Sequence, residues 1–299
     1  MTFMKKKIII LLTLFLCCMP SFSQIDRDRI EKIIHGKKAS VGVAILYKDK
    51  MFLISNGNKY PLMSVFKFHV AVAALKEMEY KGIALDSTVC IKAEQMHKNT
   101  YSPLRERYPD QDFQISYGSL IEYTASLSDN NTCDILIDFV GGISKVEAYI
   151  HTLGISDIQL TETEYTMQQN LDNCYRNWST PQSVVALLKK VYTENVLSQE
   201  HFLFLEQAML STPTGKNKLR AGLPECIALA HKTGQSGRTD SNVLIGDNDA
   251  GIVYLPSGEK CYIAVLIKDS KETDAENASI IADIAKEVYN SLINPDNTH

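Results

Sequence analysis

Residues 61–75 read PLMSVFKFHVAVAAL, in which Ser64 and Lys67 open a nearly all-apolar run. Because the run is apolar on most sides, we expect a helix buried within the molecule. Residues three apart lie on one helix face, so the Lys67 ammonium can reach the Ser64 hydroxyl. Burial favours a neutral amine that can accept a proton, and a helix N-terminus favours a nearby oxyanion. The pair therefore suits a serine nucleophile activated by a lysine.

A structural interpretation of the same pair is also open. Ser64 would cap the helix N-terminus, and Lys67 would extend its charged end along the apolar surface to solvent. Because Ser-x-x-Lys occurs by chance in many chains, other motifs must decide between the two.

Composition and charge bound the class of protein. The chain has 299 residues and a net charge of −4 without charged blocks. This length suits one domain or two intimate lobes. The absence of a basic stripe argues against a nucleic-acid partner.

The N-terminus is typical of an exported protein. Lysines at positions 5–7 precede an apolar run at 8–19 and the small residues Ser21 and Ser23. This pattern predicts a signal peptide over residues 1–23, a mature domain over 24–299, and no stable membrane span after cleavage. A lipoprotein anchored through Cys17 or Cys18 is the alternative.

The remaining cysteines are scattered, at positions 90, 133, 174, 226 and 261. Their spacing predicts neither a metal site nor a disulfide framework, and we expect no cofactor.

Strands are predicted near both ends of the chain. Residues 39–47 and 51–55 form one hairpin, and further strands are expected at 227–232, 251–255 and 261–268, before a closing helix at 274–292. The middle is predicted to be helical, from Ser64 to about Tyr80 with a stop at Gly82, at 120–126, 132–139 and 144–153, and from Pro181 through Leu210. Residues 159–178 show no usable periodicity and are expected to form a functional or mobile loop.

These elements predict a two-lobed α/β (α+β) fold. An antiparallel five-stranded sheet would be built from both termini and flanked by helices, over about 24–60 and 212–299. An all-helical lobe would be inserted at about 61–211. The cleft between the lobes is the expected site.

Two further polar motifs lie in this scaffold, Ser128-Asp129-Asn130 and Lys232-Thr233-Gly234. Together with Ser64-x-x-Lys67 they form the signature of class A β-lactamases and penicillin-binding proteins. The whole mature chain resembles the serine β-lactamases, which implies their two-lobed fold.

A fourth motif resembles the omega loop of class A enzymes, with Glu164 and Gln168 at the places of its glutamate and its asparagine. Glu162 is so near that it stays an alternative base. Glu162 and Asn177 replace the arginine and aspartate that clamp this loop in many members, so we expect no ion pair there and a more mobile loop. The disulfide common in this family is also expected to be missing, because Ala71 and Ile121 lie near the places of its two cysteines. These departures resemble the divergent Bacteroidetes-type subgroup (subclass A2), many of which favour cephalosporins.

The resemblance implies a role for each candidate residue. Ser64 would attack the lactam carbonyl, with its own N–H and that of Gln235 forming the oxyanion hole. Lys67 or a water on Glu164 would take the proton, and Ser128 would protonate the lactam nitrogen. Asn130 would contact the substrate's side-chain amide and the Lys67 region. Lys232, counted among the catalytic residues, would meet the substrate carboxylate together with Thr233 and Ser236, and Arg238 is a further candidate for that anion site. The other expected substrate contacts are Tyr101, Gln168 and Gly234.

Other polar residues receive structural interpretations. Asp129 is expected to organise its turn. His69 and His231 are expected to be packed structural residues, since neither has a ligand-like partner.

The expected function is hydrolysis of cephalosporins and penicillins by a periplasmic, monomeric enzyme, giving β-lactam resistance. The Ser64 acyl-enzyme would be deacylated by water activated by Glu164. The alternatives are a penicillin-binding D,D-peptidase and a β-lactam sensor domain that is acylated without turnover.

Overall fold

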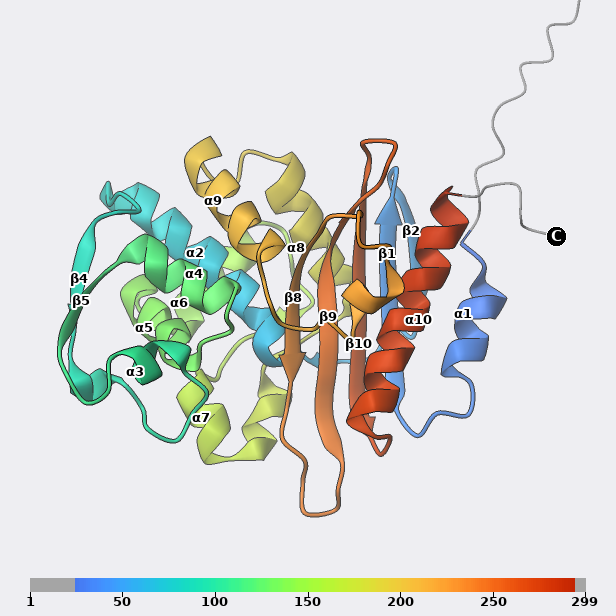
Figure 1. The fold of residues 1–299 in the computed structure, drawn as a ribbon, viewed down its shortest axis with the longest axis horizontal. Helices are drawn as coiled ribbons and strands as arrows, with labels where there is room; N and C mark the ends of the chain where they lie inside the picture. The colour runs from blue at the N-terminus through green and yellow to red at the C-terminus, as the bar shows by residue number, and fades with distance from the viewer. Residues whose placement is uncertain (1–24, 294–299) are drawn as a thin grey trace, which may run out of the picture.

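The computed structural model describes residues 25–293 (Figure 1). The expected signal peptide and the lipoprotein cysteines lie outside this range. Within residues 25–293, no helix has the length and apolarity needed to cross a bilayer.

A five-stranded antiparallel sheet, built from both ends of the chain, forms the centre of the molecule, as predicted. The strand order is β2-β1-β10-β9-β8, and β8 is one edge. The five strands are β1 (Ser40–Tyr47), β2 (Lys50–Ile54), β8 (Leu229–Gln235), β9 (Leu244–Tyr254) and β10 (Lys260–Ser270). Strand β9 begins at Leu244, well before the expected residue 251. The prediction missed its first half because buried polar residues there interrupt the apolar pattern.

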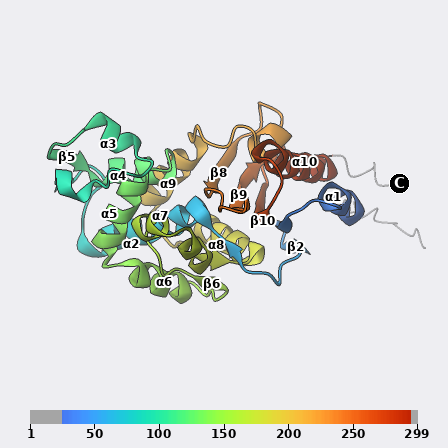
Figure 2. The same ribbon diagram turned by 90° about the horizontal axis from the view of Figure 1, so that it is seen from below.

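The two faces of the sheet are covered differently. Helices α1 (Arg27–Ile34) and α10 (Asp274–Ile293) lie together on one face, where alternate residues such as Val43 and Val265 meet them (Figures 1 and 2). On the other face, Ala44 and Leu266 join the larger core. Helix α8 (Pro181–Thr193), counted with the helical lobe in the prediction, packs against β1 and β10.

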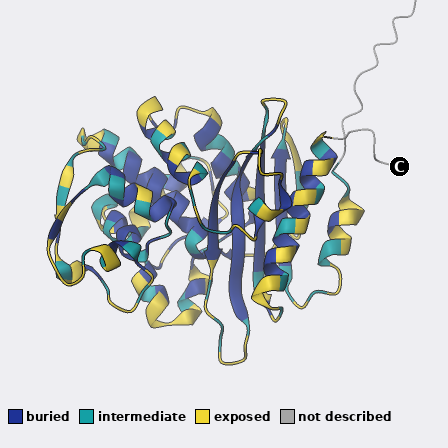
Figure 3. Cartoon of the chain, viewed as in Figure 1, coloured by how far each residue is buried: buried dark blue, intermediate teal, exposed yellow. Residues whose placement is uncertain are grey.

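Helix α2 (Phe66–Lys81) is the central element of the helical part. Every residue from Phe66 through Leu75 is buried. Figure 3, in the view of Figure 1, shows most of this helix in the dark blue of buried residues. The helix ends at Gly82, which takes the left-handed conformation (φ 66°) that glycine adopts without strain. The surrounding helices are α3 (Pro103–Arg107), α4 (Tyr117–Ala125), α5 (Asn130–Val140), α6 (Ile143–Thr152) and α9 (Gln199–Leu210).

Short elements that the sequence pattern did not reveal join these parts. In one small sheet, β7 (Trp178–Ser179) pairs with β3 (Tyr60–Pro61) on one side and with β6 (Ile158–Gln159) on the other. In a second, β4 (Thr88–Ile91) pairs with β5 (Phe113–Ser116). Single 3₁₀ turns lie at η1 (Met63–Val65), η2 (Ala93–Gln95) and η4 (Leu219–Gly222).

The expected irregular loop at 159–178 is in fact partly helical. It contains α7 (Glu164–Gln169) and the 3₁₀ segment η3 (Leu171–Arg176). Six-residue helices are too short to show an apolar period, so the expectation of an irregular loop was wrong for residues 164–176.

Candidate active site

The Ser64 turn is fixed by backbone contacts with the sheet. The Asn248 side-chain amide of β9 donates to the carbonyls of Pro61 (2.7 Å) and Leu62 (3.0 Å). Gly234 of β8 runs so close that a Cβ there would lie 2.7 Å from the Ser64 backbone nitrogen. The strand edge and the serine turn therefore form one rigid unit.

Lys67 is fully buried directly beneath Ser64. Its Nζ lies 2.8 Å from Ser64 Oγ, 2.6 Å from Asn130 Oδ1, 3.1 Å from the Ser128 carbonyl and 2.6 Å from Glu164 Oε1. The Ser64 side chain caps neither η1 nor α2. The alternative of a capping serine and a solvent-reaching lysine is therefore wrong.

The Ser128-Asp129-Asn130 turn presents Ser128 and Asn130 to the same pocket, while Asp129 faces away from it. Ser128 has a positive φ of 59°, an uncommon conformation for a non-glycine residue. Asp129 is buried, and it accepts from Thr132 N (3.0 Å), Leu104 N (2.8 Å) and Ser102 Oγ (2.9 Å). Asp129 thus organises the turn as expected, and burial raises the pKa of its carboxyl.

Lys232 approaches Ser128 from β8. Its buried Nζ donates to Ser128 Oγ (2.9 Å) and to the Thr233 carbonyl (3.0 Å). Burial lowers the pKa of Lys232 well below its usual range, and the Lys67 ammonium lowers it further. A lysine of this kind can exchange a proton with the Ser128 hydroxyl.

Glu164 reaches Ser64 from the opposite side, with Oε1 3.4 Å from Ser64 Oγ. Thr163 caps α7, and Asp134 of α5 accepts from the backbone N–H groups of Glu164 and Tyr165, both at 2.8 Å. Burial and, after it, the Glu164 charge raise the pKa of Asp134 to about 7.

Glu162 takes a different position from Glu164. It forms an ion pair with Arg176 (3.1 Å) and is not among the residues that line the pocket around Ser64. The geometry therefore favours Glu164 as the base.

The neck of the omega loop is held by a buried amide. Asn177 accepts from the backbone N–H groups of Thr161 (2.8 Å) and Glu162 (2.9 Å) and donates to the Glu162 carbonyl (2.8 Å). Asn177 is uncharged and therefore forms no ion pair with Glu162, but its hydrogen bonds still join the two ends of the loop.

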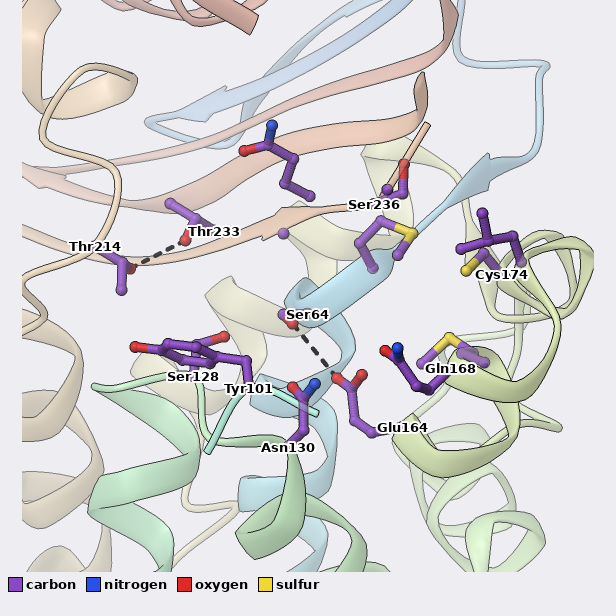
Figure 4. Close-up of a pocket in the computed structure, with 16 residues that line it drawn as sticks. Ser64, Tyr101, Ser128, Asn130, Glu164, Gln168, Cys174, Thr214, Thr233 and Ser236 are labelled. Carbon is purple, nitrogen blue, oxygen red and sulfur yellow. Dashed lines mark hydrogen bonds between the residues drawn. The ribbon is translucent and has the colours of Figure 1, made fainter. Parts of the chain in front are cut away.

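A pocket of about 400 Å³ opens in front of Ser64 (Figure 4). Ser64 lies in its centre, with Glu164 and Gln168 on one side and Thr233 on the other. The predicted residues that line it are Ser64, Tyr101, Ser128, Asn130, Glu164, Gln168, Thr233, Gly234, Gln235 and Ser236. The structure thus brings together residues separated by up to 172 positions, from Ser64 to Ser236.

Arg238 is the one candidate that the structure places elsewhere. Its guanidinium donates to the Glu272 carbonyl (2.7 Å) and pairs with Asp274 (2.5 Å). These contacts hold it at the start of α10, and it does not line the pocket.

Comparisons with known proteins show the family of the chain. Residues 27–292 match the model of the "Beta-lactamase enzyme family". A β-lactamase of Bacteroides uniformis is 46% identical, covering 97% of this chain and 100% of the relative. A class A β-lactamase structure from Bacteroides cellulosilyticus superposes with a TM-score of 0.87 at 48% identity, covering 89% of this chain and 96% of that one. The chain belongs to the class A β-lactamases. The extended-spectrum β-lactamase PER-1 of Pseudomonas aeruginosa is 33% identical, covering 95% of this chain and 94% of the relative.

Several residues of this β-lactamase site escaped sequence reasoning. The pocket is also lined by Met63, Met167, Leu171, Cys174, Thr214 and Gly237. Asp134 offered one signal, a carboxylate four residues after Asn130, which places both residues on one face of α5. Thr214 offered none, because its loop has no motif.

Both histidines are buried, as expected of packed structural residues. His69 has no hydrogen-bond partner, and burial lowers its pKa to about 4. His231 Nδ1 lies 2.9 Å from Asp249 Oδ1 in the adjacent strand. Asp249 is eighteen positions away in sequence, and the pairing of β8 with β9 brings it to His231.

Within residues 25–293, no group of three or more His, Cys, Asp or Glu side chains is placed to hold a metal ion. The five cysteines in this range are all free, with Cys133, Cys174 and Cys261 buried.

Proposed function

We propose that this β-lactamase hydrolyses cephalosporins and penicillins through an acyl-enzyme on Ser64. The observation that carries the proposal is the position of the Ser64 hydroxyl, 2.8 Å from the Lys67 ammonium and 3.4 Å from the Glu164 carboxylate. A nucleophile with two adjacent proton-transfer groups is the arrangement that serine acylation requires.

Acylation begins when Ser64 Oγ attacks the lactam carbonyl. The hydroxyl proton passes to Lys67, or to Glu164 through a water. The backbone N–H groups of Ser64 and Gln235 stabilise the oxyanion, and each such donor contributes about 3–4 kcal/mol.

Ring opening then requires a proton on the lactam nitrogen. Ser128 supplies it as the C–N bond breaks, and the hydrogen bond from Lys232 to Ser128 Oγ (2.9 Å) supports replacement of that proton. Asn130, with its Oδ1 on Lys67 and its Nδ2 on Thr100 (2.7 Å), is the contact for the substrate side-chain amide.

Deacylation requires a water beside the ester. Glu164 removes its proton as the water oxygen attacks the Ser64 ester, and Gln168 helps to hold that water. The proton returns to Ser64 Oγ when the product leaves. If Glu164 lowers the barrier to hydrolysis of the acyl-enzyme by about 7 kcal/mol, deacylation is faster by roughly five powers of ten than without this base.

A preference for cephalosporins is supported by two features. The relative PER-1 bears the name extended-spectrum β-lactamase. In addition, three large hydrophobic side chains are exposed: Tyr165 on α7, Leu171 on η3 and Tyr101 in the loop before α3. The mobility of the omega loop stays a prediction, and hydrogen exchange in residues 159–178 as slow as in the core would contradict it.

We propose export to the periplasm and action as a monomer. The basic and apolar N-terminal sequence supports export, and cell-wall-targeting antibiotics are encountered there. Antibiotic resistance follows when hydrolysis outpaces acylation of the cell's own peptidases.

In the alternatives, a penicillin-binding D,D-peptidase or a non-hydrolytic sensor, no base is poised to deliver water to the β-lactam adduct, so the adduct persists. The approach of Glu164 to Ser64 argues against both.

The test is turnover of a chromogenic cephalosporin by the mature protein beside Ser64→Ala. We expect turnover in the parent and none above background in the variant. An acyl adduct on the parent that persists for hours would overturn the proposal and favour the sensor or peptidase class.

A further inference from the structure

A chain of hydroxyl groups crosses from the helical part to the edge strand of the sheet. Thr212 Oγ1 donates to the Ser126 carbonyl at the end of α4 (2.7 Å). Thr214 Oγ1 lies 3.0 Å from Thr212 Oγ1 and 3.0 Å from Thr233 Oγ1. Thr214 and Thr233 both line the pocket, and Figure 4 shows their hydroxyl groups in contact.

The direction of each hydrogen bond in this chain follows from its fixed end. A carbonyl only accepts, so the single Thr212 proton is committed to Ser126. Thr212 then accepts from Thr214, and Thr214 accepts from Thr233. In this arrangement all three protons point away from the pocket.

Penicillins and cephalosporins carry a carboxylate, which needs donors at this side of Ser64. Among the described residues that line the pocket there is neither lysine nor arginine. Arg238 is held at α10, and the Lys232 Nζ beneath the pocket already donates to Ser128 and to the Thr233 carbonyl. Hydroxyl groups must therefore supply much of the direct contact with the anion.

We propose that Thr214 is a positioning residue for the substrate carboxylate, an inference that rests on the function proposed above. When the anion enters, Thr233 turns its proton to the carboxylate, and Thr214 turns its own proton to Thr233. The Thr212 hydroxyl still accepts a hydrogen bond after this change, because the Thr214 backbone nitrogen donates to Thr212 Oγ1 at 3.4 Å. A hydroxyl that accepts a hydrogen bond is itself a stronger donor, so Thr214 strengthens the contact of Thr233 with the anion.

The experiment compares a cephalosporin with its methyl ester, which lacks the charge. Thr214→Val keeps the shape and removes the hydroxyl, whereas Thr214→Ser keeps the hydroxyl. For the acid, we expect Thr214→Val to raise KM about five- to tenfold with little change in kcat. For the ester, kcat/KM should change less than twofold, and Thr214→Ser should behave like the parent with both substrates.

Thr193→Val is the matched control, because Thr193 is exposed at the end of α8 and bonds only its own helix at the Lys189 carbonyl. Equal losses for acid and ester, or an unchanged KM for the acid, would overturn the inference. The ester also serves as the internal measure of folded enzyme, and Thr214→Ala is a second variant without the hydroxyl. If the parent turned over neither substrate, the proposed function itself would fall and this inference with it.

Discussion

The two sides of the pocket are built in different ways. Ser64, Lys67 and Lys232 lie on a buried helix and an edge strand, whose positions follow from backbone pairing and a large core. Glu164 lies on a six-residue helix whose position depends on side-chain hydrogen bonds. Asp134 bonds the first two backbone N–H groups of this helix, and Asn177 bonds the chain just before it.

This difference separates the two half-reactions. Lys67 and Lys232, proposed for acylation, are held by regular secondary structure, whereas Glu164, proposed for deacylation, is held by a few side-chain hydrogen bonds. Changes in the omega loop should therefore slow deacylation more than acylation, whereas changes at β8 should slow acylation.

The largest effect is expected on the rigid side, from Gly234→Ala. The added Cβ would lie 2.7 Å from Ser64 N, 2.8 Å from the Leu62 carbonyl oxygen and 2.9 Å from Met63 Cβ. Because these atoms are backbone or close to it, the oxyanion hole must open, and kcat/KM should fall by about 10²–10³. Gly57→Ala is the control, since a Cβ there meets nothing within 4 Å. A variant at 234 with parental acylation kinetics would contradict the account.

Asn177→Ala should act on the other side of the pocket. It removes three hydrogen bonds at a fully buried position and leaves buried backbone groups without partners. We expect deacylation to slow by about 10- to 100-fold, with acylation within a few-fold of the parent and a lower melting temperature. Pre-steady-state kinetics separate the two steps. Equal slowing of both would break the distinction between the two sides.

Asp134→Asn tests the same side through pH. Burial and the Glu164 charge, opposed by Lys67, raise the pKa of Asp134 to about 7. Below that pH the carboxyl gains a proton and one acceptor for the α7 backbone is lost, so deacylation should decline as pH falls through 7. The asparagine side chain of the variant has only one oxygen that can accept from the α7 backbone. Turnover by the variant should therefore be about tenfold lower at pH 8, and it should not decline further as pH falls through 7.

Stability should vary with pH in the opposite direction. Between the ordinary value of 3.8 and about 7, folded Asp134 holds a proton that the unfolded chain has released. Stability therefore falls as pH rises through this window, by at most about 1.4 kcal/mol per pH unit. Asp134→Asn should lose this contribution to the slope in denaturant titrations. An identical slope in parent and variant would contradict the assignment.

The smallest effect is expected from Arg176→Ala. Its ion pair with Glu162 lies in the same loop as Asn177, but the arginine side chain is 65% exposed. Exposed pairs contribute about 0–1 kcal/mol, so turnover should stay within about twofold of the parent. A loss as large as that of Asn177→Ala would show that the ion pair, and not the buried amide, holds the neck.

The sequence predicted best what regular periodicity and short motifs encode. The helix from Ser64, its stop at Gly82 and the five-stranded sheet follow from apolar pattern and turn residues. The three motifs predicted which residues gather around Ser64, because each motif lies on an element whose position the fold determines.

The sequence could not reveal contacts that depend on the final packing. Arg238 is near the motif in sequence, but Asp274, thirty-six positions away, determines where its guanidinium lies. Asp134 and Thr214 act through backbone and hydroxyl partners that only the folded chain brings near. The first half of β9 was missed because Asp247, Asn248 and Asp249 are polar residues buried by specific partners.

The most direct test of the central claim is intact mass recorded during cephalosporin turnover by the parent and by Glu164→Ala. If Glu164 is the deacylating base, the parent should turn over freely, and the variant should accumulate an adduct one ring-opened substrate heavier on Ser64. Turnover by the variant at the parental rate would contradict the account, and Glu164 would be an ordinary carboxylate of the loop.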